Sequence, residues 1–303
     1  MSAASFTLTY DNTSDATFRA WVSALDAQIT ALGWVHGTDT GQFNFTTGTR
    51  SATAGANFVI YKSADAISPT IVLKVEFIAV LTTKPGFVIS VGFATDGAGN
   101  LTGVLQTTRW ANQNNTTLSD TVARNCIISG DAGRLAFALN MNAVTAGNSC
   151  LVSVERSKDT SGADTGDAVL VTMIPGGTAG GAGMTVNGVA SHNAFQYLPT
   201  TGTAIPSVED YLPLILSNTV SGSGAFGTTI GFGVPIPLAG SAQNPGTNVL
   251  AALTADYPTR DSTVTVSLYG TNHTYYSLGP NWTHLAATAG TVTNNASMLM
   301  RDD

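Results

Sequence analysis

Short segments in which apolar and polar residues alternate run through most of this 303-residue chain, and this pattern limits the fold more than any other feature. Successive side chains of a β-strand point to opposite faces, so alternation is typical of strands with one buried face. Residues 56–63, 70–80 and 86–95 follow one another in this way. They predict an antiparallel meander.

The alternation extends beyond the meander. Phe43 and Phe45 alternate with polar residues before it. Later segments with the same pattern are bounded by the turn-forming residues Gly, Asn, Asp and Pro; they are 124–130, 134–142, 149–157, 167–174, 228–237, 262–270 and 273–279. Strands at this spacing predict a mainly β fold, either an antiparallel β-sandwich or an irregular barrel.

One segment, residues 14–32, has a helical period instead. Its apolar residues recur at i, i+3, i+4 and i+7, which places them on one face of a helix; they are Phe18, Trp21, Val22, Leu25, Ile29 and Leu32. Ser14 suits the N-cap and Gly33 suits the stop. We expect this N-terminal amphipathic helix to pack on the domain's own sheet, with contact to a neighbouring subunit as the alternative.

The composition agrees with a chain of many tight turns, because only 10% of the residues are charged and 32 are glycine. All-β domains run to about 250 residues as one unit, so we expect a single β-rich domain over residues 1–303. The Gly-rich stretch 175–185 is the only candidate internal boundary. Strand candidates after it are sparse, so we interpret it as a long loop within that domain.

The net charge of −7 disfavours nucleic acid as a partner, since the sequence has no basic cluster that could bind a phosphate backbone. No apolar run reaches the roughly 18 residues of a membrane span, because Lys74 and Glu76 interrupt the closest one. The first residues, MSAASFTLTYDNT, lack the basic and apolar regions of a secretion signal. We expect a soluble protein made without export.

The two cysteines, Cys126 and Cys150, are too few for a disulfide scaffold or a Cys-rich metal site. They flank a predicted hairpin, so a disulfide between them is conceivable in geometry. We favour two buried thiols. The sequence leaves the redox state of the pair open.

Two polar stretches have oxygen-rich side chains that suit a cation site. Asp96–Asn100 has one Asp, one Asn and two glycines, which a β-turn explains without a metal. Lys158–Asp167 is the better metal candidate, because Asp159, Asp164 and Asp167 fall within one short segment. Their spacing matches no known loop motif, so we interpret this stretch as a solvated hairpin and predict no metal site.

Other patterns for chemistry are incomplete. Gly176–Gly183 resembles a phosphate loop but lacks the Gly-Lys-Ser/Thr ending, and the sequence has neither a G-x-S-x-G nor an HExxH motif. The four histidines are scattered: His36, His192, His273 and His284. No pattern pairs two carboxyl groups as in a glycosidase; the candidates are Glu76, Asp131, Glu155, Glu209 and Asp210. We therefore predict no catalytic residue, no cofactor and no enzymatic activity.

Aromatic side chains offer an alternative function, because flat rings stack on the apolar faces of sugars. The residues concerned are Trp110, Tyr211, Tyr269, Tyr275, Tyr276 and Trp282. Strand cores and subunit interfaces use the same residue types. A carbohydrate-binding surface therefore stays an alternative prediction.

Several stretches together resemble a family of tailed-bacteriophage virion proteins, most of which are uncharacterised. The resemblance covers about Trp21 to Gly279, nearly the whole chain. Its most specific parts are TDGAGNLTG (95–103), ERSKDTSGADTGD (155–167) and YGTNHTYYSLG (269–279). The chain departs from the family pattern after Phe77, where EFIAVLTTKPG replaces the Tyr and Gly that often follow this strand.

The resemblance implies a non-enzymatic structural component of the virion, made in the cytoplasm of the bacterial host. The expected place is the tail, neck or baseplate, with homo-oligomer formation and contacts to other virion proteins. Low charge suits such surfaces, because few charges need desolvation when an interface forms. Two alternatives stay open: a module that binds host-surface carbohydrate, and a decoration protein on the capsid surface.

Overall fold

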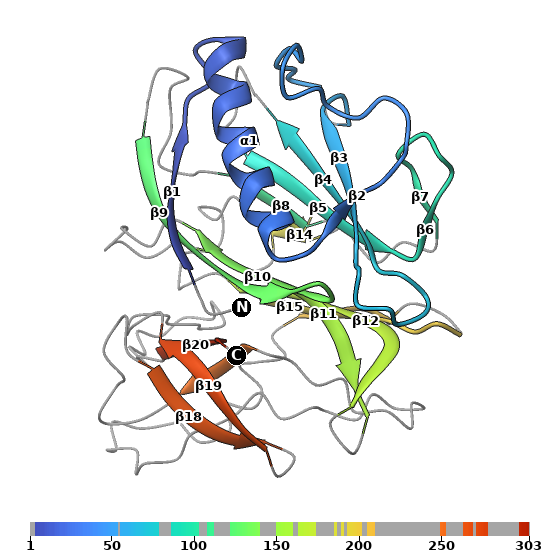
Figure 1. The fold of residues 1–303 in the computed structure, drawn as a ribbon, viewed down its shortest axis with the longest axis vertical. Helices are drawn as coiled ribbons and strands as arrows, with labels where there is room; N and C mark the ends of the chain where they lie inside the picture. Colours follow the sequence, from blue (N-terminus) through green and yellow to red (C-terminus); the bar gives the residue numbers. More distant parts are fainter. Residues whose placement is uncertain are drawn as a thin grey trace.

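A computed structural model describes most of the first half of the chain and shorter segments of the second half (Figure 1). The described ranges are 4–53, 55–78, 86–102, 108–111, 122–139, 150–159, 163–173, 185–186, 189–190, 193–201, 205–209, 249–252, 263–268, 271–277 and 297–302. Within them, antiparallel β-sheets dominate, and one helix lies near the N-terminus.

The helix α1 (Asp15–Ala31) confirms the helix prediction. Ser14 is its N-cap and forms a capping box with Thr17, in which each residue's side chain accepts a hydrogen bond from the other's backbone N–H. After the C-cap Leu32, Gly33 adopts a φ of 101°, a left-handed conformation that suits glycine. The predicted apolar stripe is buried from Phe18 to Ile29.

Seven antiparallel strands form the first sheet, here called sheet I. In spatial order they are β1 (Ala4–Tyr10), β9 (Val122–Asp131), β10 (Arg134–Leu139), β11 (Cys150–Lys158), β12 (Asp164–Met173), β15 (Asn193–Leu198) and β16 (Ile205–Glu209). The N-terminal strand β1 pairs along its whole length with β9.

A second seven-stranded sheet, sheet II, contains the predicted meander as β3, β4 and β5. In spatial order its strands are β14 (Val189–Ala190), β13 (Thr185–Val186), β8 (Thr108–Ala111), β5 (Gly86–Gly92), β4 (Val72–Ile78), β3 (Phe58–Lys62) and β2 (Val35–His36). The alternation around Phe43 and Phe45 does not form a strand. Phe43 lies in the loop between β2 and β3, where its ring packs edge-on against Phe18.

Two smaller sheets complete the described fold. Sheet III consists of β17 (Val249–Ala252), β20 (Ser297–Arg301), β19 (Thr271–Ser277) and β18 (Thr263–Leu268). A short hairpin joins β6 (Ala94–Thr95) to β7 (Leu101–Thr102). Figure 1 shows sheet III on the far side of sheet I from sheet II and α1.

The main core lies between sheets I and II, with α1 packed into it. One buried cluster combines side chains of α1, sheet I and sheet II, including Trp21, Phe137 and Phe77. The rings of Trp21 and Phe77 meet edge-on at 5.8 Å between centroids. The opposite face of sheet I is buried as well, since Ser129, Ser153 and Val169 have no exposed surface. The arrangement is sandwich-like.

This arrangement confirms a mainly β fold with one N-terminal helix, and the described strands do not close into a barrel. The predicted strand 228–237 lies outside the described residues, as does most of the Gly-rich stretch 175–185, whose last residue begins β13. On either side of that stretch, β12 and β15 pair directly within sheet I. Strand β1 was not predicted.

Cys126 and Cys150 flank the strand β10 rather than a hairpin. Cys150 pairs with Leu139 of β10, and Cys126 lies on β9, the neighbour of β10 on the other side. Two strand spacings amount to about 10 Å, whereas disulfide-bonded cysteines have Cα atoms less than about 7 Å apart. The geometry therefore excludes a disulfide between them, and Cys126 has a buried thiol.

Candidate functional site

The stretch Asp96–Asn100 forms the turn of the β6–β7 hairpin, as predicted. The Asp96 N–H donates to the Asn100 carbonyl at 3.0 Å, and Asp96 Oδ1 accepts from the Asn100 N–H at 3.1 Å. The Asn100 side chain donates to Asp96 Oδ2 at 2.7 Å, which is the main reason why the pKa of Asp96 is lowered. Both carboxylate oxygens therefore close the turn.

The β11–β12 hairpin is closed in the same way. The Asp159 N–H donates to the Ala163 carbonyl at 2.9 Å, and Asp159 Oδ1 accepts from the Ala163 N–H at 3.0 Å. In both hairpins an aspartate thus bonds the backbone four residues later. We call these two segments, Asp96–Asn100 and Asp159–Ala163, the aspartate-closed turns.

The loop predicted over Asp159–Asp167 is shorter than expected. Asp164 already belongs to β12, and Asp167 lies further along the strand with only 5% of its surface exposed. Asp167 Oδ1 accepts from the Thr200 N–H at 2.7 Å and so connects β12 to the turn after β15. Within the described ranges, no three His, Cys, Asp or Glu side chains form a group that could hold a metal ion.

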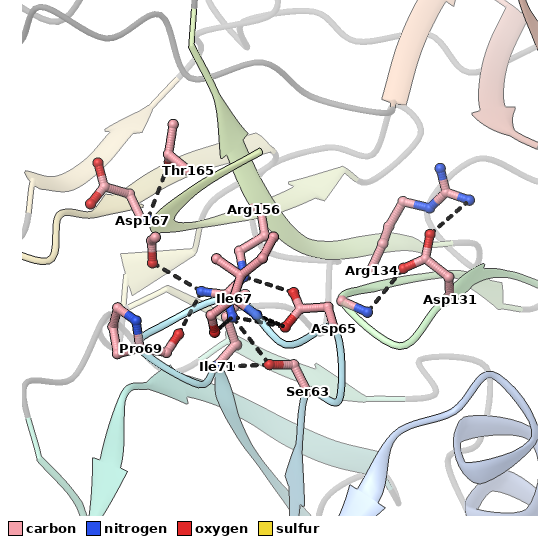
Figure 2. Close-up of polar contacts among 12 residues, drawn as sticks. Ser63, Asp65, Ile67, Pro69, Ile71, Asp131, Arg134, Arg156, Thr165 and Asp167 are labelled. Carbon is pink, nitrogen blue, oxygen red and sulfur yellow. Dashed lines mark hydrogen bonds and ion pairs between the residues drawn. The ribbon is translucent and has the colours of Figure 1, made fainter. Parts of the chain in front are cut away.

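A buried arginine forms the densest polar cluster that the structure describes (Figure 2). Arg156, on β11, has a side chain that is 2% exposed. Its guanidinium donates to both carboxylate oxygens of Asp65, at 2.9 and 3.1 Å, and to the Ser63 hydroxyl at 3.3 Å. Backbone carbonyls accept its other bonds; they belong to Ile67, Pro69 and Gly166.

The hydrogen bonds of this Arg156 cluster stabilise the fold. Its acceptors come from the β3–β4 connection in sheet II and from β12 in sheet I, so the guanidinium joins the two sheets. Six bonds use its five N–H groups, which leaves no donor for a ligand. Burial favours a higher pKa for Asp65, but the hydrogen bonds and charge of Arg156 outweigh it and lower the pKa.

A second polar cluster joins α1 to sheet II. Asp26 Oδ1 lies 2.6 Å from His36 Nε2 and accepts from the Tyr61 hydroxyl at 2.8 Å. His36 also stacks on Phe45, with 6.0 Å between ring centroids. His36 is 43% exposed and Asp26 is 17% exposed.

The carboxyl groups considered for glycosidase chemistry do not come together. Glu76 lies on the outer face of sheet II, where it pairs with Lys74 at 3.2 Å. Glu155 lies on sheet I, facing away from its core neighbour Val154, and is buried rather than solvated. The sandwich core therefore separates these two. Asp131 pairs with Arg134 beside the β9–β10 turn. The Glu209 side chain and Asp210 lie outside the described part.

The predicted aromatic surface is described at only two positions. Tyr275, on β19, is fully buried, so it does not line a surface, and Tyr276 is partly buried. The other side chains lie outside the described residues; they are Trp110, Tyr211, Tyr269 and Trp282. The same is true of His192, His284 and the glycines of 176–183, whereas His273 is a partly buried residue of β19.

No family model matches this sequence, and no curated protein matches it either. None of the described residues forms a helix that could span a lipid bilayer.

Neither polar cluster was predicted from the sequence. A signal for the Arg156 cluster was present in the sequence. Along β11, Arg156 alternates with the buried residues Val152 and Val154 so that all three fall on the same face of the strand. A charge at a core position requires a buried partner. The sequence gives no sign that Asp65 is that partner. For Asp26, the sign was a carboxylate close to the apolar stripe of α1.

Proposed function

We propose that this protein is a non-enzymatic structural component of a tailed-phage virion, located in the tail, neck or baseplate. We infer that it assembles as a homo-oligomer and contacts other virion proteins. The sequence resemblance supports this proposal, and its three most specific segments fall in hairpins: β6–β7, β11–β12 and β18–β19.

One observation carries the proposal: the two aspartate-closed turns use their carboxylates on their own backbone. The segments that most resemble virion proteins therefore specify loop shape. Hairpins closed by such bonds are suited to repeated contacts between subunits, because little conformational entropy of the bonded residues is lost when they bind.

Mass spectrometry of purified phage particles, followed by gold-labelled antibody against the recombinant chain, tests the location. Label at the tail, neck or baseplate supports the proposal. Label over the capsid faces would instead identify a decoration protein. Absence of the chain from particles that infect normally would overturn a virion role.

Light scattering of the purified chain tests self-assembly, with a symmetric oligomer as the expected result. A monomer at all accessible concentrations would contradict it. The carbohydrate alternative requires saturable binding on a glycan array that is lost in Tyr276→Ala or Trp282→Ala. Glycan binding that is saturable and is lost in these variants would support host recognition instead of a structural role.

A further inference from the structure

The N-terminal strand β1 forms one edge of sheet I. Among the described strands it pairs only with β9, and all 7 of its residues take part in that pairing. The backbone N–H and C=O groups along its other edge therefore have no partner strand among those that the structure describes. An edge of this kind can pair with a strand of another chain.

The other edges of sheets I and II have features that disfavour such pairing. At the far end of sheet I, the sequence of β16 contains Pro206 and Glu209, and its pairing with β15 shifts in register. The edges of sheet II are β2 and β14, of 2 residues each. Proline, charge, bulges and short length are the means by which natural sheets protect their edges. The strand β1, ASFTLTY, is long and has neither charge nor proline.

The outer face of β1 is open to solvent. Its outward residues Ser5, Thr7 and Thr9 are exposed, whereas Ile127, the β9 partner of Ser5, is only 3% exposed. The cover over the outer face of sheet I therefore ends between β9 and β1. The alternate residues of β1 pack on the sandwich core. A strand added beyond β1 would extend both faces of the sheet.

The sequence of β1 is suited to pairing with itself. Thr7 is its middle residue, so an antiparallel pair of β1 strands with a two-fold axis at Thr7 is matched along its whole length. That register places Phe6 opposite Leu8 and Ser5 opposite Thr9. Polar residues then meet on the outer face and apolar residues on the core face, with no like charges opposite each other.

We propose that β1 is a subunit interface, in which the β1 strands of two copies pair antiparallel about Thr7 and join two copies of sheet I into one continuous sheet. This inference rests on the homo-oligomer proposed above and names the surface and symmetry of one contact. The strand β18 is a second edge without charge or proline. A contact of β1 with β18 of another copy would be heterologous and would not place Thr7 opposite itself.

Cysteine crosslinking tests the register. In Thr7→Cys, the two new thiols would face each other on Cα atoms about 4.5–5.5 Å apart, which suits a disulfide. Mild oxidation should therefore give a covalent dimer on non-reducing electrophoresis, above the background of the unmodified chain. Thr9→Cys is the matched control on the same exposed face. Its two thiols would lie four residues apart, or about 13 Å, and should not crosslink.

A mixed sample gives a further test of the same register. Ser5→Cys combined with Thr9→Cys should crosslink, although neither variant should do so alone. Light scattering that shows an oligomer, together with equal crosslinking of Thr7→Cys and Thr9→Cys, would overturn this interface and leave homo-oligomer formation intact. A chain that stays monomeric would contradict both the interface and self-assembly.

Thr7→Lys provides a measurement that does not depend on oxidation. In the proposed interface it would place two ammonium groups opposite each other, which disfavours pairing. Thr7 is exposed, so the variant should keep the circular dichroism spectrum of the unmodified chain. Light scattering should then show a loss of oligomer mass. An unchanged mass in the folded variant would contradict the β1 interface.

Discussion

Arg156 holds a full positive charge at a site where its side chain is almost inaccessible to water. Its replacement by methionine would remove six hydrogen bonds and leave the Asp65 carboxylate without its cation. Loss of one partner from a buried ion pair costs about 3–5 kcal/mol. We therefore expect Arg156→Met to lower the free energy of unfolding by about that amount in urea titrations.

Arg50→Met is the matched control for Arg156→Met. The Arg50–Asp15 pair is separated by 3.6 Å, and both of its side chains are more than one third exposed. Pairs of this kind contribute about 0–1 kcal/mol. Equal losses in the two variants would show that burial does not set the contribution of Arg156.

The same cluster predicts an acid dependence. Because Arg156 lowers the pKa of Asp65 in the folded chain, the stabilisation is present above the usual carboxyl pKa and is lost as pH falls through the lowered value. Asp65→Asn should therefore be clearly less stable than the unmodified chain at pH 7. The difference should shrink below about pH 4. A difference that stays constant from pH 7 to pH 2.5 would contradict this prediction.

Two glycines of one turn offer a matched pair. Gly97 and Gly99 have φ values of 82° and 83°, so alanine meets the same backbone strain at each. A Cβ at Gly97 would have no neighbour within 4 Å, whereas one at Gly99 would lie 2.2 Å from the Phe58 ring. We expect Gly97→Ala to lose about 1–2 kcal/mol and Gly99→Ala to lose a further 1–3 kcal/mol, roughly, by overpacking. Thermal unfolding that shows equal losses would mean that Phe58 moves freely.

At the scale of the element, α1 depends on its first turn as well as on its buried face. Ser14→Ala removes the side-chain half of the capping box and should cost about 1 kcal/mol of stability. Ser23→Ala, in the interior of the same helix, is the control and should be neutral or slightly stabilising, because alanine has the higher helix propensity. Comparable losses in both variants would exclude capping as the cause.

Sequence patterns predicted an element correctly where the residues that determine it lie within one short segment of the chain. The helix was predicted because cap, apolar stripe and stop all lie within one short segment. The pattern around Phe43 and Phe45 did not predict the structure correctly, because these residues lie in a loop. Their rings meet edge-on with each other and, for Phe43, with Phe18, and the Phe43 N–H bonds the Phe58 carbonyl of β3 without a strand forming. The Arg156 cluster could not be predicted from a sequence pattern, since Asp65, the ion-pair partner of Arg156, lies 91 residues away in the chain.

At the scale of the whole molecule, the order of strands in sheet I fixes the state of the cysteines. Because β10 separates β9 from β11, we expect both Cys126 and Cys150 to react with a thiol reagent after denaturation without a reductant. Addition of a reductant should leave the Tm unchanged. Detection of a Cys126–Cys150 crosslink by mass spectrometry would contradict the strand order of sheet I.

Strand β1 has a consequence for the order of events during synthesis. It is synthesised before the other described strands, but its residue Ala4 pairs with Ile128, which is synthesised much later. The β3–β4–β5 meander needs no such delay, because its strands are neighbours in sequence. Three strands of sheet II can therefore pair before sheet I has any described strand except β1, and a nascent chain stalled before residue 122 would show an unattached β1 beside a formed meander.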